Sequence, residues 1–119
     1  MIIYPPYIAD TVPAFVNGKI KIPFFINPAT TMNQIKGAKI AIKPYNATSQ
    51  EVYYSISNNI AYNNDGKSGI AIFDNEGEFT LVKNSYYKFQ LSFHDGDEIF
   101  ESFSTAAVGK CLGDKNDAP

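Results

Sequence analysis

The sequence contains no arginine, so all 10 of its basic residues are lysines. Arginine carries the planar, two-pronged donor group that binds phosphates and guanine edges, and lysine cannot imitate it. The formal net charge of -2 adds no positive field that would attract nucleic acid. We therefore expect no nucleic-acid partner.

Cysteine and histidine occur once each, as Cys111 and His94. A lone cysteine cannot form an internal disulfide, so packing must supply the stability of the chain. A lone histidine excludes a histidine-based metal cluster. We expect His94 at the surface end of a strand, and Cys111 as a free thiol in a polar tail.

Long hydrophobic runs are also missing. No stretch approaches the roughly 18 consecutive apolar residues of a membrane-spanning helix. The residues from Met1 to Pro6 lack the basic and long apolar regions of a secretory signal. We expect no membrane partner and no export by a signal of the chain's own.

Strand-forming residues are abundant instead. Apolar residues make up 45% of the 119-residue chain and aromatic residues 14%, with many isoleucines, tyrosines and phenylalanines. This composition is typical of a globular protein and favours β-structure. The length suits one domain with its own hydrophobic core.

Apolar residues recur at every second position in several short runs, which is the period of a strand with one buried face. The clearest run lies in residues 79–93, where Tyr87, Phe89, Leu91 and Phe93 alternate with polar residues. We expect this to be the central strand. Further strands are predicted at 3–8, 19–26, 38–43, 50–57, 68–73 and 99–108.

In residues 50–57, the alternation runs through Val52, Tyr54 and Ile56, which predicts these three side chains on the buried face. A short helical turn is predicted only within Thr30 to Lys36.

Roughly seven or eight short strands separated by turn signals predict an all-β fold, an antiparallel two-sheet sandwich. A small closed barrel is the alternative. We expect the sandwich to span residues 1–110 and residues 111–119 to form a polar tail or linker.

Leu81 and Tyr87, followed by the alternating run, resemble the corner between the fifth and sixth strands of fibronectin type III and related immunoglobulin-like modules. The resemblance implies that the Tyr87 hydroxyl forms a hydrogen bond with backbone between Leu81 and Asn84. Phe24 takes the place of the tryptophan that these modules carry on an early strand. The adhesion tripeptide Arg-Gly-Asp is absent, so integrin-type adhesion is not expected.

The strand-rich, arginine-free style of the chain, with Tyr4-Pro-Pro-Tyr-Ile-Ala near its start, is similar to modules in virion proteins of crAss-like gut bacteriophages. This second resemblance implies a structural role in a virion.

Clusters of acidic and amide side chains occur at Asp95, Asp97 and Glu98, and at Asn63 to Asp65. Such oxygen-bearing groups bind calcium, but both runs are shorter than a calcium loop and stand where a hairpin needs its turn. We predict two solvated turns, and no catalytic, cofactor or metal site in the chain.

Tyrosines are the best candidates for an interface, because they combine a large contact area with a polar tip. The four we single out are Tyr4, Tyr7, Tyr53 and Tyr54. The last two are adjacent in a predicted strand and must face opposite ways, so one of them points outward.

The sequence therefore predicts a noncatalytic structural or interaction module of a larger assembly. Its partners would be protein subunits, either copies of itself in a homo-oligomer or other proteins of a bacteriophage virion. The alternative is a carbohydrate-binding or adhesion module of a bacterial surface protein.

Overall fold

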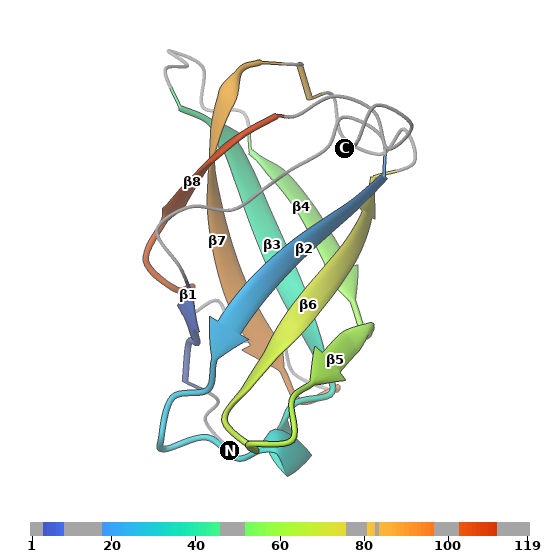
Figure 1. The fold of residues 1–119 in the computed structure, drawn as a ribbon, viewed down its shortest axis with the longest axis vertical. Coiled ribbons are helices and arrows are strands. Elements are labelled where there is room, and N and C mark those ends of the chain that lie inside the picture. The colour runs from blue at the N-terminus through green and yellow to red at the C-terminus, as the bar shows by residue number, and fades with distance from the viewer. Residues whose placement is uncertain are drawn as a thin grey trace.

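The computed structural model describes residues 4–8, 18–45, 52–75, 81–82, 84–96 and 103–111. In these ranges, two antiparallel four-stranded sheets pack face to face, with β2 and β6 of one in front of β3 and β7 of the other (Figure 1). The predicted all-β sandwich is therefore confirmed. The first sheet has the order β1-β2-β6-β5 and the second the order β4-β3-β7-β8. The strands are β1 Tyr7–Ile8, β2 Gly18–Phe25, β3 Gly37–Pro44, β4 Tyr53–Ser57, β5 Ile60–Tyr62, β6 Ser68–Asn75, β7 Tyr86–His94 and β8 Ala107–Lys110.

Strand β2 follows its sequence pattern throughout. Ile20, Ile22 and Phe24 are buried, while the residues between them are exposed. This regular alternation arises because successive side chains of a strand point to opposite faces of the sheet. The apolar face of β2 packs across the interior against β7, whose Phe89, Leu91 and Phe93 are also fully or almost fully buried.

A tyrosine corner fixes the entry into β7. The backbone N–H of Val82 donates a hydrogen bond to the Tyr87 hydroxyl at 2.8 Å, within the stretch expected from the sequence resemblance. Leu81 is buried beside it in the core. Asn84 completes the bend with a φ of 70°, a left-handed conformation that asparagine tolerates better than most residues.

Replacing Tyr87 by phenylalanine should cost about 1 kcal/mol of unfolding free energy, because the Val82 N–H loses its acceptor while the buried ring remains. Urea unfolding followed by circular dichroism measures the change. Tyr86→Phe is the matched control, since Tyr86 is the adjacent residue and is exposed. Equal losses in the two variants would contradict a stabilising role for the corner hydrogen bond.

The prediction for residues 50–57 is wrong about which side is buried. Tyr54 and Ile56 are 53% and 52% exposed, whereas Tyr53 packs against the core. Antiparallel pairing with β3 places Tyr53 opposite the buried Ile42 and Tyr54 opposite Ala41. Because paired residues share a face of the sheet, the register with β3 determines which side of β4 is buried, and the composition of β4 does not.

The end of the chain also differs from the prediction. Residues 103–106 are not a strand, and β8 begins only at Ala107. Cys111 does not lie in a polar tail: it is fully buried in the core. Its backbone N–H donates to the Ser85 carbonyl and its carbonyl accepts from the Asn84 N–H, both at 2.9 Å. The described sandwich therefore includes Cys111, and residues 112–119 of the expected tail lie outside the described residues.

His94 is buried at the end of β7, contrary to the surface position expected from the sequence. It pairs with Gly37 on β3, and the missing side chain of that glycine leaves room for the imidazole. Its Nδ1 accepts a hydrogen bond from the Gly96 N–H at 3.2 Å. Its buried Nε2 has no hydrogen-bond partner in the part of the chain that the structure describes.

Two smaller elements complete the fold. The helical turn predicted within Thr30 to Lys36 is a short 3-10 helix, η1, at Met32–Gln34. Strand β5, which the sequence pattern did not predict, forms a hairpin with β6 around the Asn63 to Gly66 turn.

Candidate interaction face on the second sheet

The outer face of the second sheet carries an unusual row of side chains across its middle. Ala41 on β3 lies between Tyr54 on β4 and Gln90 on β7, because it is the register partner of both. Alanine is short, so the larger side chains on either side stand above it. The centre of the face is consequently hollow.

This hollow is a depression of about 370 Å³. One wall is formed by the segment at 103–106, which is tied to β7 through Ser104. The Ser104 N–H donates to the Leu91 carbonyl at 2.8 Å, and the Ser104 hydroxyl accepts from the Leu91 N–H at 3.0 Å. The Gln90 amide donates to the Ser104 carbonyl at 3.0 Å, which fixes a polar side chain at the rim. The lining residues are Ala41, Lys43, Val52, Tyr54, Lys88, Gln90, Phe103 and Ala106.

Lysines lie over the aromatic rings around the depression. The Lys39 ammonium is 4.8 Å from the centre of the Tyr54 ring and 5.9 Å from that of Phe103. The Lys88 ammonium is 5.2 Å from the centre of the Tyr45 ring. Such cation–π contacts hold the long side chains close to the sheet and keep the positive charge at its surface. We call this surface the lysine–tyrosine face and define it by Lys39, Ala41, Lys43, Tyr45, Tyr54, Ile56, Lys88, Gln90 and Phe103.

Two of these lysines are placed directly opposite each other. Lys43 and Lys88 are register partners on neighbouring strands, and both point away from the core. Among the described residues, neither forms an ion pair with a carboxylate. The described acidic residues lie elsewhere, in the β5–β6 turn, on β6 and beyond the far end of β7. The described part of this face is therefore purely cationic in its formal charges.

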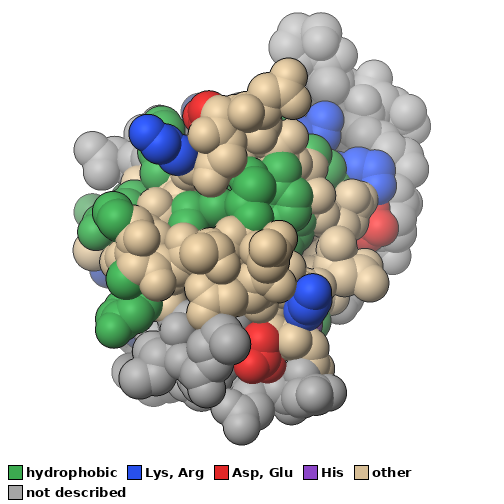
Figure 2. Space-filling view, turned by 90° about the horizontal axis from the view of Figure 1, so that it is seen from below, with side chains coloured by type: hydrophobic (Ala, Val, Ile, Leu, Met, Phe, Trp, Pro, Cys, Tyr) green, Lys and Arg blue, Asp and Glu red, His purple; other side chains and the backbone are tan. Residues whose placement is uncertain are grey.

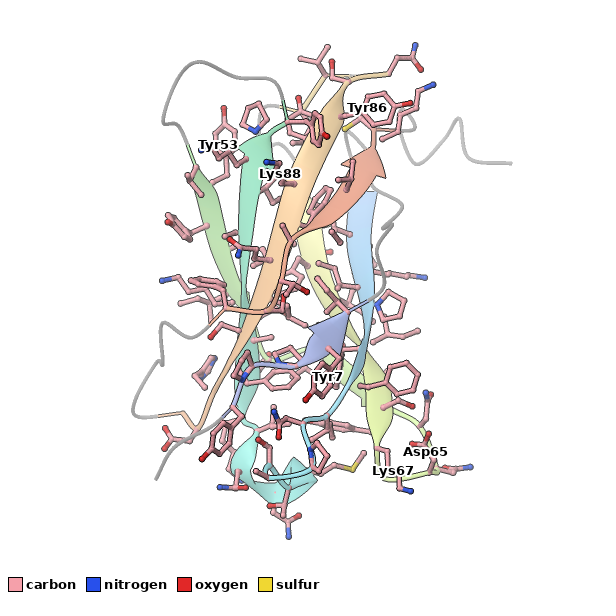
Figure 3. The ribbon with its side chains drawn as sticks, turned by 90° about the vertical axis from the view of Figure 1, so that its left-hand side faces the viewer. Tyr7, Tyr53, Asp65, Lys67, Tyr86 and Lys88 are labelled. Atoms are coloured by element: carbon pink, nitrogen blue, oxygen red, sulfur yellow. The ribbon has the colours of Figure 1, made fainter. Side chains whose placement is uncertain are left out.

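The structure does not bring the four predicted tyrosines together. Tyr54 lies on the lysine–tyrosine face, but Tyr53 points into the sandwich. Tyr7, which is 57% exposed, pairs with Phe25 in the first sheet. The Tyr4 N–H donates to the Thr30 hydroxyl, in the connection between β2 and β3. Figure 3 shows Tyr53 and Lys88 near one end of the sandwich, while Tyr7 lies closer to the other.

A larger depression of about 470 Å³ lies at the end of the sandwich where β2 finishes, between the β2–β3 connection and the β5–β6 turn. Hydrophobic side chains gather in the middle of that end (Figure 2). Two of its polar side chains have local roles, because Asn27 accepts from the Ala29 N–H and Thr30 accepts from the Tyr4 N–H.

The polar tip at Asn63 to Asp65 is built as a turn. The Asp65 carboxylate accepts from the backbone N–H groups of Lys67 and Ser68 at 2.8 and 3.0 Å, and from the Ser68 hydroxyl at 2.9 Å. These hydrogen bonds hold the pKa of Asp65 below its usual value, and the bond from the Lys67 N–H contributes most. The carboxylate is thus engaged in local structure. Of the other acidic cluster, Asp97 and Glu98 lie outside the described residues.

The thiol of Cys111 is unsuited to nucleophilic chemistry. Burial in the core raises the pKa of Cys111 to about 11, so the thiol stays protonated at neutral pH. Within the described ranges, no group of three or more histidine, cysteine or acidic side chains is arranged to hold a metal ion. The described residues also contain no helix of sufficient length and apolar character to cross a membrane.

No protein-family model matches this chain, and no curated protein matches it.

The sequence indicated Tyr54 as a candidate for an interface but did not indicate the residues that surround it. The lysines at 39 and 43 were visible only as the polar side of an expected strand. Nothing in the local pattern indicated that Lys88 would lie opposite Lys43, or that Phe103 would reach Tyr54, with ring centres 6.4 Å apart. These neighbours come from three separate parts of the chain.

Proposed function

We propose that this chain is a noncatalytic interaction module that docks onto a protein partner through the lysine–tyrosine face. The observation that carries the proposal is the exposure of Tyr54 and Ile56 beside the depression over Ala41. Large apolar side chains gathered around a hollow, with charged groups at the rim, are typical of binding surfaces. The core of the sandwich is complete without them.

The setting we propose is a larger assembly, a bacteriophage virion, in which the module would contact other subunits. This part rests on the resemblance of sequence style. The strand order of the two sheets and the corner at Tyr87 support the related proposal of a fibronectin-like module. Genes for capsid or tail proteins beside the gene for this chain would support the setting, and a gene cluster for cell-surface polysaccharide enzymes would count against it.

A carbohydrate-binding module is the competing proposal. Sugars stack on the flat faces of exposed aromatic rings, which makes Tyr54 its natural platform. The Lys39 ammonium already lies over one face of this ring. That contact favours a protein partner, which can use the ring edge and the alkyl part of the lysine as well.

Symmetry argues against a face-to-face pair of identical copies. In such a pair the same surface meets itself, so Lys43 and Lys88 of one copy would approach those of the other. Like charges brought together in an interface are costly. If the chain forms a homo-oligomer, we expect the lysine–tyrosine face to contact a different face of the neighbouring copy.

The test is selection of a random peptide library on the purified protein, followed by NMR mapping of the bound peptides. We expect the selected peptides to shift the amide signals of Ala41, Tyr54 and Gln90. Tyr54→Ala should weaken their binding by about 2 kcal/mol, or roughly 30-fold in Kd, as truncation of a central aromatic contact does.

Tyr7→Ala is the matched control, because Tyr7 is a tyrosine of similar exposure on the other sheet. Its peptide affinity should equal that of the unaltered protein. Peptides that map only to other surfaces would overturn the proposal. Binding on a glycan array that Tyr54→Ala abolishes would favour the carbohydrate module instead.

A further inference from the structure

We propose that the lysine–tyrosine face recognises an acidic segment of its partner, with a carboxylate bound between Lys43 and Lys88 and an apolar side chain in the depression over Ala41. This inference rests on the proposed docking function and adds the chemistry of the occupant. The occupant would be an extended peptide with alternating acidic and apolar residues.

The lysine pair carries two like charges side by side. Lys43 and Lys88 are directly opposite each other on neighbouring strands, and like charges in this position destabilise a sheet. Within the described ranges no carboxylate neutralises them. A carboxylate from outside would accept hydrogen bonds from both ammonium groups and remove the repulsion.

The spacing between the lysine pair and the depression matches that of an extended peptide. Ala41 and Lys43 are two residues apart on β3 and face the same side of the sheet. Side chains two residues apart in an extended chain are separated by about 7 Å, both in β3 and in a peptide lying along it. A peptide with an apolar residue over Ala41 would therefore place its second neighbour at the lysine pair.

Single-stranded nucleic acid also binds lysines and aromatic rings, but it depends on bases stacking on open ring faces. Here Lys39 lies over the rings of Tyr54 and Phe103, and Lys88 lies over the ring of Tyr45. These lysines leave bases less open ring surface to stack on, which favours a peptide.

The probe for the test is a fluorescein-labelled octapeptide of serines with one leucine, and one glutamate two positions after it. Three matched peptides carry glutamine for the glutamate, serine for the leucine, or the glutamate directly next to the leucine. We expect the first peptide to bind roughly 5-fold or more tightly than each of the others by fluorescence anisotropy. Raising the salt concentration should remove most of the advantage over the glutamine peptide.

Protein variants assign the effect to the lysine pair. Lys43→Gln and Lys88→Gln should each weaken binding of the glutamate peptide by roughly 5-fold and leave the glutamine peptide unchanged. Lys21→Gln is the matched control, because Lys21 is an exposed lysine on the first sheet. Without peptide, Lys43→Gln should raise the Tm, since it removes the repulsion between the two lysines and leaves the contact of Lys88 with Tyr45 in place.

The outcomes separate this inference from the proposed function. If library-selected peptides map to the lysine–tyrosine face but the lysine variants bind the glutamate peptide unchanged, the acidic occupant is wrong and the docking function stands. If no peptide maps there, both fail. A fluorescein-labelled oligothymidylate that binds more tightly than the glutamate peptide, with the same dependence on Lys43 and Lys88, would also overturn the inference.

Discussion

Phe24→Ala is expected to destabilise the sandwich by about 3–5 kcal/mol, the range found when a large aromatic side chain is removed from a core. Phe24 is only 2% exposed and belongs to the first sheet. Its ring meets that of Phe93 on the second sheet edge-on, with ring centres 5.0 Å apart. A second edge-on contact joins it to Tyr62 at 6.4 Å. Removing it leaves a cavity between the two sheets.

The chain supplies a close control for this experiment. Phe25 is the next residue and has the same side chain, but it points outward and is 63% exposed. Phe25→Ala should therefore change the unfolding free energy by about 0.5 kcal/mol or less. Urea denaturation of the two variants measures the difference. Similar losses at both positions would mean that the alternation of β2 does not determine which phenylalanine supports the fold.

Gly37→Ala is expected to have the second-largest effect, a loss of about 2–3 kcal/mol, because a side chain at this position would displace the buried His94 imidazole and press against the backbone of β4. A Cβ on Gly37 would overlap the His94 imidazole, with Cε1 at 2.6 Å, and would lie 3.0 Å from the Ser57 carbonyl oxygen. The glycine thus provides the space into which His94 folds. Thermal unfolding and urea denaturation both measure the loss.

A double variant tests this explanation. In a His94→Ala background the imidazole is gone, so Gly37→Ala should cost clearly less than in the unaltered protein. Some cost remains, because the Ser57 carbonyl is part of the β4 backbone and stays in place. Strictly additive losses in the double variant would show that the two residues do not compete for the same space.

These two variants affect the interior, whereas the lysine–tyrosine face lies on the outside of the second sheet. Lys88 projects from β7, whose alternate side chains belong to the core, and Tyr54 projects from β4, where the neighbouring Tyr53 packs against the core. We therefore expect substitutions on the face to alter binding while leaving the fold intact. This separation makes Tyr54→Ala and the lysine variants informative about function, since loss of binding in them does not reflect unfolding.

Much of the fold could be predicted because the alternation of a strand is a local property. In β2 the isoleucines and Phe24 alternate with residues that water can reach, and only one assignment of faces buries the apolar set. In strand β4 the local pattern misleads, because the face with Tyr54 and Ile56 is the more apolar one and yet points outward. Pairing with β3 turns Tyr53 inward instead.

The candidate site was harder to predict than the fold. The sequence singled out Tyr53 and Tyr54 as interface candidates without showing which of them is exposed, and the importance of Tyr54 comes from Ala41 beside it and from the lysines around it. The depression exists because a small residue happens to lie between two large ones on neighbouring strands. The burial of His94 was missed in the same way, since it depends on a glycine across the strand pair.

The sequence by itself determined the all-β class of this protein, the buried faces of β2 and β7, and the residues of the corner at Tyr87. Only the tertiary structure decided which side of β4 is buried, which lysines lie opposite each other, and where a hollow forms. The reason is physical: the two-residue period is set by the backbone of one strand, whereas the neighbours of a side chain across a sheet are set by pairing between segments that are distant in the chain.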